Sequence, residues 1–275
     1  MADHMDDDLA PGPALVAAAD ATTTLRLGTL VYANDYRHPV VLAKEAATLD
    51  LLSDGRLELG MGAGWMTADY EQSGIPFDRA GTRIARLEEA VVVVKALLAG
   101  DEPVTFEGEH YRIEGLLGTP RAVQRPHPPL VIGGGGKKVL SLAGRHADVV
   151  GINVNLAKGV IDADAGPDST AAKTAEKVRW VREAAGERFD DVELQVRVHL
   201  AAITDDRDGM ADALAAGFGL SPEEAVASPH SLAGTVEQVA EDLQAMREVH
   251  GISYVGLSLA SMHEMAPVVA RLSGA

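Results

Sequence analysis

The chain has 275 residues, which is long enough for one large α/β domain with a substantial buried core. Its formal net charge of -17 argues against binding to nucleic acid or to an anionic membrane. The absence of cysteine excludes a disulfide framework, a thiolate nucleophile and a cysteine-ligated metal, and it fits a cytoplasmic protein. The sequence contains no apolar run of about 20 residues, so no membrane-spanning helix is predicted. Residues 1–12 lack the pattern of a signal peptide.

Predicted strands and helices alternate along the chain after an acidic, proline-rich start that we expect to be an exposed loop. Strands are predicted over residues 25–32, 56–62, 130–132, 148–153, 193–203 and 252–259. Helices are predicted over residues 14–21, 40–52, 82–98, 137–145, 170–185, 236–249 and 264–272. This alternation predicts an α/β fold with a parallel sheet, either a barrel or a doubly wound sheet.

Two stretches interrupt the alternation. Residues 101–128 contain a predicted hairpin, and residues 204–231 are predicted to form short helices, one of them with Ser221 as its cap. No shift in composition marks a domain boundary. We therefore expect a single domain over residues 1–275 with these two insertions.

The stretch 49–65 joins a helix end to a short strand and a glycine-rich exit. An Asp-Gly pair ends the helix, because glycine takes the left-handed conformation without steric cost. On the strand over residues 56–62, one face carries large apolar side chains and the other carries Glu58, Gly60 and Gly62. The glycine face leaves space for another group to approach the backbone, at the strand end where parallel α/β folds bind ligands.

A second glycine-rich run, Gly133–Gly136, directly follows a predicted strand and precedes a predicted helix. Glycines let backbone N–H groups approach an anion, and the helix N-terminus adds a favourable dipole. Lys137 and Lys138 add positive charge. The run predicts a phosphate site, the alternative being a tight turn without a ligand. It is not a dinucleotide-binding fingerprint, because the required acidic residue is missing.

Three segments resemble the bacterial luciferase-like monooxygenase family, and in particular its actinobacterial F420-dependent oxidoreductases. They read NDYRHPVVLAKEAATLDLLSDGRLELGMGAGW (34–65), PFDRAGTRIARLEEAVVVVKALL (76–98) and PHPPLVIGGGG (126–136). The resemblance covers essentially the whole chain and implies a TIM-type (β/α)8 barrel with insertions. Residues 2–4 resemble the end of the family's second strand. The resemblance therefore predicts a barrel that lacks its first strand and helix and exposes unpaired strand edges.

The resemblance also implies which residues hold a flavin-type cofactor, coenzyme F420 first and FMN as the alternative. Residues 29–31 correspond to the third strand of the family's barrel, where F420-using relatives have a bulge that supports the deazaflavin ring. The alternative for this chain is an ordinary buried strand. The glycines at residues 62–64 would lie beside the cofactor, and the run Gly133–Gly136 would hold its phosphate side. The implied cofactor-binding residues are Thr29, Leu30, Gly62, Ala63, Gly64, Gly133, Gly134, Gly135, Gly136 and Lys137.

The resemblance makes His4 the best acid–base candidate, with Asp3 beside it in sequence. The alternative is that both belong to a frayed terminus. Trp65 is the third catalytic candidate, because the resemblance aligns it with a glutamate that donates a proton in some F420-using relatives. As a tryptophan it is expected either to pack against the cofactor ring or substrate or to have a structural packing role. His38 is expected to cap the helix that follows it, and the histidines show no metal-binding spacing.

The function predicted from the resemblance is hydride transfer between coenzyme F420 and a small organic substrate. F420 does not readily activate oxygen, so its use implies dehydrogenase or reductase chemistry. Three alternatives stay open: an FMN-dependent monooxygenase of the same family, an N-terminally truncated non-catalytic remnant and, more distantly, a sugar- or phosphate-processing barrel. Family analogy predicts a homodimer. Asn153 and Asn155, at a predicted strand end, are further candidates for contact with cofactor or substrate.

Overall fold

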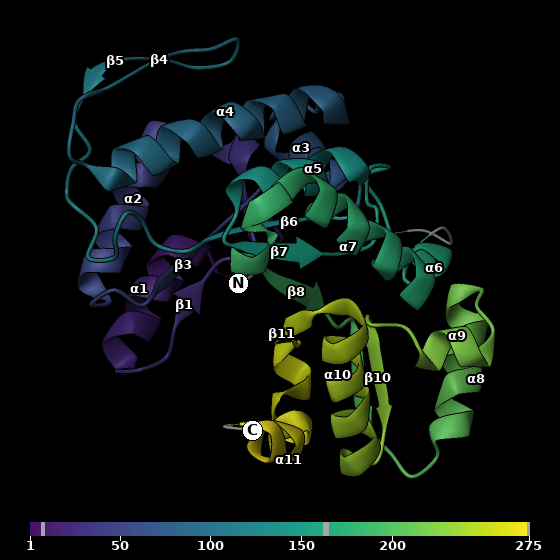
Figure 1. Ribbon diagram of the computed structural model, residues 1–275. Coiled ribbons are helices and arrows are strands. Elements are labelled where there is room, and N and C mark those ends of the chain that lie inside the picture. The colour runs from purple at the N-terminus through teal and green to yellow at the C-terminus, as the bar shows by residue number, and fades with distance from the viewer. Residues whose placement is uncertain (7–8, 162–164, 274–275) are drawn as a thin grey trace. The chain divides into compact units, whose positions relative to one another are not determined.

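The computed structural model describes residues 1–6, 9–161 and 165–273. The chain divides into two compact units, which we describe one at a time (Figure 1). Unit 1 comprises Met1–Gly133, Arg145–Val149 and Ala157–Val160. Unit 2 comprises Gly134–Gly144, Val150–Leu156 and Ile161–Ala275.

Unit 1 is an α/β unit built on short parallel strands. Strands β1 and β2 both pair with β3, and β3 pairs with β6 in a register that sets Leu59 opposite Leu130. Its elements are α1 (Pro11–Ala21), β1 (Leu27–Gly28), β2 (Tyr32–Ala33), the 3-10 turn η1 (Asn34–Tyr36), α2 (Pro39–Leu52), β3 (Leu57–Gly62), α3 (Thr67–Ser73), α4 (Ala80–Ala99), β4 (Val104–Glu107), β5 (Arg112–Leu116) and β6 (Leu130–Gly134), whose last residue belongs to unit 2.

Helices α2 and α4 of unit 1 show the signals that the sequence predicts, whereas α1 begins at Pro11, earlier than predicted, and α3 was not predicted. Pro39 occupies the first turn of α2, and the Nδ1 atom of His38 accepts a hydrogen bond from the backbone N–H of Val40, which confirms the predicted cap. Helix α4 buries one apolar stripe, including Leu87 and Val91, and ends at Gly100 in the left-handed conformation. Helices α2 and α4 pack against each other.

The predicted strand over residues 25–32 is interrupted. Leu27–Gly28 and Tyr32–Ala33 pair with β3 at Leu57–Glu58 and at Met61–Gly62. Between these two paired stretches the segment 28–32 contains one residue more than the segment of β3 opposite it. The extra residue defines a β-bulge over residues 29–31. The peptide bond between Leu30 and Val31 is cis.

The insertion 101–128 contains the predicted hairpin, formed by the antiparallel strands β4 and β5. In Figure 1 the hairpin projects beyond the helical layer formed by α4. The carboxylate of Glu89, on α4, accepts hydrogen bonds from three consecutive backbone N–H groups at residues 109–111 in the hairpin turn. These contacts anchor the hairpin to α4.

Unit 2 is also α/β, with β7, β8 and β11 in one parallel order. A second, two-stranded parallel sheet pairs β9 with β10. The elements are α5 (Lys137–His146), β7 (Val149–Ile152), α6 (Ala165–Asp168), α7 (Ala171–Ala185), η2 (Gly186–Asp191), β8 (Glu193–Arg197), β9 (Leu200–Ile203), α8 (Arg207–Phe218), α9 (Pro222–Val226), β10 (Ser231–Gly234), α10 (Val236–His250), β11 (Ile252–Gly256), η3 (Leu259–Ser261) and α11 (Met262–Leu272). The last two residues of α5 and the first of β7 belong to unit 1.

The predicted single strand over residues 193–203 is wrong, because it divides at Val198–His199 into β8 and β9, which pair with different partners. Apolar residues continue through the division, so the hydropathy pattern gives no sign of it. The insertion 204–231 contains the expected short helices, α8 and α9. The pattern did not predict β10, which follows them.

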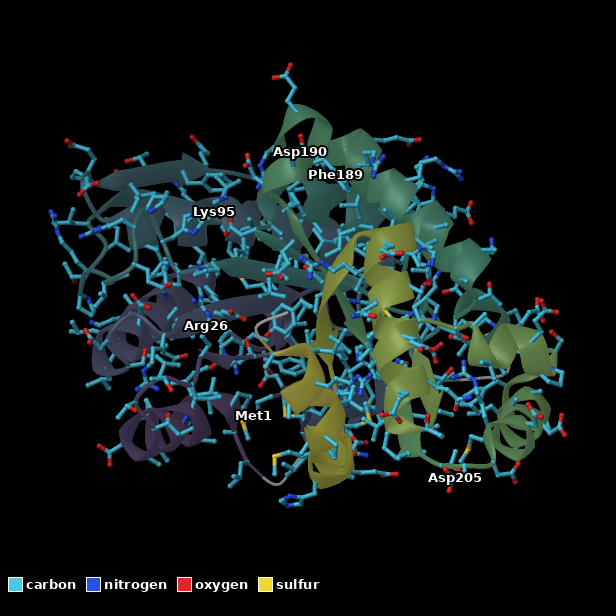
Figure 2. The ribbon with its side chains drawn as sticks, turned by 60° about the horizontal axis from the view of Figure 1, so that its bottom comes forward. Met1, Arg26, Lys95, Phe189, Asp190 and Asp205 are labelled. Carbon is cyan, nitrogen blue, oxygen red and sulfur yellow. The ribbon has the colours of Figure 1, made fainter. Side chains whose placement is uncertain are left out.

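Capping residues position the helices of unit 2. Ser221 forms the predicted cap of α9, and Thr235 forms a capping box with Gln238 at α10. Asp206 caps α8 by accepting the N–H of Gly209, whereas the preceding Asp205 points away from the ribbon into solvent (Figure 2). No helix in the described parts of the chain is long and apolar enough to cross a membrane.

Candidate functional site

In unit 1, the side chain of His4 is held by a carboxylate that the sequence did not single out. The Nδ1 atom of His4 lies 2.7 Å from Oδ2 of Asp69, on α3. Asp69 also accepts the backbone N–H of Met5 at 3.0 Å and the hydroxyl of Tyr36 at 3.0 Å. With Nδ1 bound to a carboxylate, the other ring nitrogen, Nε2, is the one that presents its lone pair or proton away from the pair.

The environment of Asp69 keeps its carboxylate charged. Burial opposes the charge, but hydrogen bonds from His4, from the N–H of Met5 and from Tyr36 outweigh it, so the pKa of Asp69 is lowered. Burial and the hydrogen bond to Asp69 raise the pKa of Tyr36, which therefore stays a proton donor in this pair. A buried, charged Asp69 therefore orients the imidazole of His4.

Trp65 completes this cluster. Its ring meets the ring of His4 edge to face, with centroids 5.6 Å apart and an interplanar angle of 87°. It follows the end of β3, the strand end at which the sequence predicted ligand binding. An indole offers only an N–H donor, so Trp65 cannot serve as an acid at neutral pH. The structure therefore brings two of the three predicted catalytic residues together.

Asp3, the third predicted catalytic residue, points elsewhere. Its carboxylate accepts hydrogen bonds from the guanidinium of Arg37, at 2.7 and 3.3 Å, and from the backbone N–H of Ala33. These contacts fix the first residues of the chain beside β2. Asp3 therefore anchors the segment that carries His4, and the carboxylate that contacts the His4 ring is that of Asp69.

The glycine face of β3 is occupied by the chain itself. A Cβ atom at Gly60 would lie 1.9 Å from the carbonyl oxygen of Thr29, and one at Gly62 would lie 2.5 Å from the side chain of Val31. The hydroxyl of Thr29 also donates to the carbonyl of Gly60 and accepts its N–H. The group that approaches the backbone here is thus the bulge that contains Leu30, and contact of these residues with a cofactor stays a prediction.

The loop after β3 is held in the same manner. A Cβ atom at Gly64, whose φ is +71°, would lie 1.9 Å from the hydroxyl oxygen of Tyr70. The buried guanidinium of Arg83 donates to the carbonyls of Ala63 and Gly64 and lies over the ring of Phe77. These contacts fix the backbone that leads into Trp65.

In unit 2, the glycine run leads directly into α5. A Cβ atom at Gly134 would strike the side chain of Val139, and one at Gly135 would lie 2.2 Å from the carbonyl oxygen of Val154. Gly136 differs, because its nearest neighbour is the side chain of Asn155 at 3.8 Å. Lys137, the first residue of α5, is exposed. Gly133 lies in β6 within unit 1.

A buried ion pair supports the segment that packs on this run. The Nζ atom of Lys177 is 2.6 Å from the carboxylate of Asp168 and donates to the carbonyl of Asn153 at 2.9 Å. The same carboxylate accepts the backbone N–H of Asn155 at 2.6 Å. Burial lowers the pKa of Lys177, although Asp168 opposes the shift. The pair therefore sets the position of Asn155 beside Gly136.

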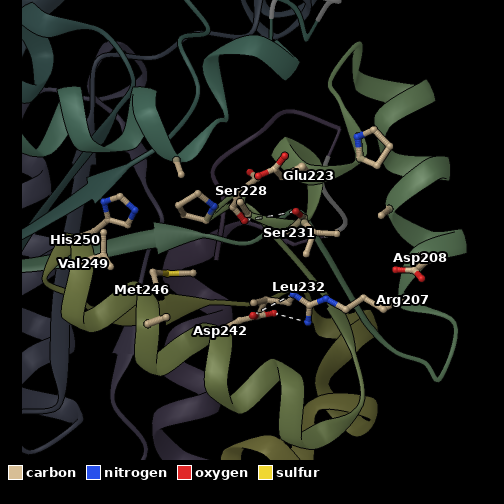
Figure 3. Close-up of a pocket in the computed structure, with 17 residues that line it drawn as sticks. Arg207, Asp208, Glu223, Ser228, Ser231, Leu232, Asp242, Met246, Val249 and His250 are labelled. Carbon is tan, nitrogen blue, oxygen red and sulfur yellow. Dashed lines mark hydrogen bonds and ion pairs between the residues drawn. The ribbon is translucent and has the colours of Figure 1, made fainter.

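Unit 2 also holds a cavity of about 600 Å³ between α8, α9, β10 and α10. Arg207 and Asp242 face each other there in a two-pronged ion pair (Figure 3). No residue from the predicted cofactor or catalytic sets lines this cavity. Within the described ranges, no group of three or more potential metal ligands was found either.

Sequence reasoning missed Asp69 and Tyr36. Asp69 lies 65 residues from His4 in sequence and on a seven-residue helix, α3, that the periodicity did not indicate. Tyr36 lies in the polar stretch that was predicted to be a loop and forms the turn η1. No local pattern links either residue to His4, so only the folded chain reveals the cluster.

Comparison of the fold with solved structures finds a coenzyme F420-dependent tetrahydromethanopterin reductase from Methanopyrus kandleri. The superposition has a TM-score of 0.77 at 20% sequence identity and covers 98% of this chain and 88% of the other. At this identity the likeness shows the fold alone. It supports the α/β architecture predicted from the strand–helix alternation.

Comparison of the sequence finds relatives that use different cofactors. The FMNH2-dependent dimethylsulfone monooxygenase of Pseudomonas putida is 28% identical over 245 residues, covering 88% of this chain and 64% of the relative. The F420-dependent glucose-6-phosphate dehydrogenase of Amycolatopsis mediterranei is 30% identical over 188 residues, covering 67% and 52%. The chain thus spans less than two thirds of either relative. The family model for luciferase-like monooxygenases matches residues 1–250, and the chain belongs to that family.

Proposed function

We propose that this chain is an oxidoreductase that transfers a hydride between coenzyme F420 and a small organic substrate. The observation that carries the proposal is the His4–Asp69 pair beside Trp65, at the end of β3. Nδ1 of His4 is bound to a buried carboxylate, and none of the described residues forms a hydrogen bond with its Nε2 atom. An imidazole held in this way is suited to proton transfer near neutral pH.

The start of α5 fits the phosphate side of a flavin-type cofactor. A Cβ atom at Gly136 would make only ordinary van der Waals contact, with the side chain of Asn155 at 3.8 Å, and an exposed Lys137 follows it. N–H groups of the first helical turn have no partners within the helix and can bind an anion. Gly134 and Gly135 serve the packing of the loop, so we assign the anion contact to Gly136, Lys137 and the backbone that follows.

The cofactor, when bound, would supply the hydride chemistry, and the chain would supply position and proton handling. His4 would give or take a proton at Nε2 as the substrate carbonyl or hydroxyl changes state. Asp69 would orient the imidazole, and Tyr36 would hold Asp69. Trp65 would exclude water from one side of His4 and would take no part in proton transfer.

The bulge over residues 29–31 supports F420 over FMN, because the resemblance to F420-dependent oxidoreductases implies a bulge in the corresponding strand. Both cofactors occur among the relatives, so FMN remains the second candidate. With FMN, the same chain would act as a monooxygenase and consume oxygen. We also propose that residues 1–275 form one barrel domain of the luciferase-like type and that the chain assembles as a homodimer.

Turnover assays test the proposal with two histidine variants. The protein is incubated with F420 or reduced FMN and a set of alcohols, aldehydes and sugar phosphates, while cofactor absorbance and oxygen consumption are followed. We expect F420-dependent turnover without oxygen uptake, and a loss of about 100-fold in His4→Asn. The exposed His263, changed to Asn, serves as the matched control. Equal rates in the two variants would remove His4 from the mechanism.

A further inference from the structure

The strand β8 and the residues after it present a polar face at the carboxyl end of the strand. Side chains alternate along it, with Leu194, Val196 and Val198 buried on one side. The other side carries Gln195, Arg197 and His199. Carboxyl ends of parallel strands are where α/β folds bind ligands. Arg197 and His199 therefore stand at the functional end of unit 2.

Arg197 has no partner for its charge. Its Nε atom is buried without a hydrogen bond, and across residues 1–6, 9–161 and 165–273 no group forms an ion pair or hydrogen bond with its guanidinium. Three other partly buried arginines have carboxylate partners: Arg37 binds Asp3, Arg86 binds Asp35 and Arg207 binds Asp242. Arg83 and Arg56 bind oxygen atoms of the backbone or of a hydroxyl instead. In a chain with 41 acidic residues, an arginine left unpaired in this way indicates a position that receives its anion from outside.

The groups around Arg197 do not neutralise it. The Nδ1 atom of His230 donates to the backbone carbonyl of Arg197 at 2.9 Å, which leaves the Nε2 atom of His230 as a buried acceptor without a partner. The ring of His199 stacks on that of His230, with centroids 5.8 Å apart, and binds the side chain of Asn153 at 3.0 Å. The nearby cation of Lys177 is already bound to Asp168.

Two histidines that stay neutral complete this arrangement. Burial lowers the pKa of His230 to about 4, and burial together with the Arg197 charge lowers the pKa of His199. At neutral pH Arg197 is therefore the group in this cluster that offers an unpaired positive charge. The hydrogen-bond acceptor of the cluster is Nε2 of His230, whose Nδ1 is bound to the backbone carbonyl of Arg197. A molecule with an anionic group and a hydroxyl matches both the charge of Arg197 and the acceptor Nε2 of His230.

We propose that Arg197 binds an oxyanion on the substrate, either a carboxylate or a phosphate ester, and that the Nε2 atom of His230 accepts a hydrogen bond from a hydroxyl of the same molecule. This proposal rests on the proposed function, since it defines the substrate class of that oxidoreductase. The planar guanidinium suits both oxyanions, because it can donate two parallel hydrogen bonds to either.

Binding of inorganic phosphate and of acetate, at constant ionic strength, tests the proposal without any cofactor. NMR resonances of the His199 and His230 rings report on ligands at this cluster. We expect a saturable change in wild type and an affinity about tenfold weaker in Arg197→Gln. Arg197→Lys, which keeps the charge, should be intermediate, and Arg179→Gln, on the exposed face of α7, should behave as wild type. The tighter of the two anions identifies the oxyanion of the substrate.

Three results would overturn the proposal. These are the absence of a saturable change in wild type, equal affinities in wild type and Arg197→Gln, and an Arg197→Gln variant that loses F420 or FMN affinity as strongly as phosphate affinity. The third would assign the arginine to the phosphate of the cofactor. Melting temperatures of the variants verify that each is folded. Failure of the proposed function would appear separately, as a lack of cofactor binding with phosphate binding intact.

Discussion

The Nδ1 atom of His4 and the Oδ2 atom of Asp69 lie 2.7 Å apart, although 65 residues separate them in sequence. This contact joins the first residues of the chain to α3 and gives His4 a fixed orientation beside Trp65. It also gives His4 a carboxylate partner other than Asp3, its neighbour in sequence. The geometry of the unit 1 site depends on this pair.

Replacing Asp69 by Asn should damage both turnover and stability. The variant loses the charge that holds the His4 ring, so we expect turnover to fall by about 100-fold. Three donors lose a charged acceptor, so we expect the free energy of unfolding to fall by about 2 kcal/mol. Urea unfolding and turnover assays measure the two effects. Unchanged turnover in a folded Asp69→Asn variant would remove Asp69 from the proposed mechanism.

The stabilising effect of Asp69 on the folded protein should depend on pH in a defined direction. Because the pKa of Asp69 in the folded chain lies below its unfolded value of 3.8, its stabilising effect is complete above that value and disappears as pH falls through the folded pKa. The difference in stability between wild type and Asp69→Asn should therefore shrink in acid. A difference that stays constant at every pH would contradict this origin.

Gly60 should not tolerate a side chain. In Gly60→Ala the new Cβ would meet the carbonyl oxygen of Thr29 at 1.9 Å, so the bulge or β3 must shift, at a cost of about 3 kcal/mol. Gly217→Ala in α8 is the matched control, because no atom lies within 4 Å of its Cβ position. That change should be neutral or stabilising by about 0.5–1 kcal/mol. Thermal unfolding of the two variants measures both effects.

Gly135 and Gly136 should respond differently to the same substitution. Gly135→Ala places its Cβ against the backbone of Val154, so we expect a loss of about 2 kcal/mol in stability. Gly136→Ala has space, so stability should be unchanged, while its methyl group hinders the approach of a phosphate to the backbone. We expect cofactor affinity to fall by about tenfold in this variant. Wild-type affinity in Gly136→Ala would place the anion elsewhere.

His230 should make the protein less stable in mild acid. Burial lowers its pKa from 6.5 to about 4, so between those pH values the unfolded chain binds more protons than the folded chain. Its stabilising effect is complete above pH 6.5 and is lost as pH falls toward 4, amounting to about 3 kcal/mol. His230→Gln should flatten the stability profile over that range, whereas His263→Gln should leave it unchanged. Parallel profiles for His230→Gln and wild type would contradict the assignment.

Much of the fold could be predicted because its signals are local. The stripe of α4, the capping boxes at Ser221 and Thr235 and the β4–β5 hairpin each depend on residues within one or two turns of the chain. The division between β8 and β9 could not be predicted in this way. An apolar sequence is compatible with one long strand or with two, and the pairing partners decide between them.

The site was predicted only in part, for a related reason. Residue types and their positions at strand ends predicted His4, Trp65 and the two glycine runs as site residues. What those glycines pack against depends on contacts between strands, such as Thr29 against Gly60. The same holds for Asp69, whose role arises from a contact between distant segments. An isolated aspartate in sequence gives no indication of such a partner.

The central claim, that this chain binds coenzyme F420 with α5 at its phosphate side, is tested most directly by a fluorescence titration of F420 with the purified protein. FMN is titrated in parallel, and Gly136→Ala is compared with Gly217→Ala. We predict saturable binding of F420, tighter than that of FMN, that is weakened in Gly136→Ala and retained in Gly217→Ala. The absence of saturable binding of F420 to the folded wild-type protein would contradict the account.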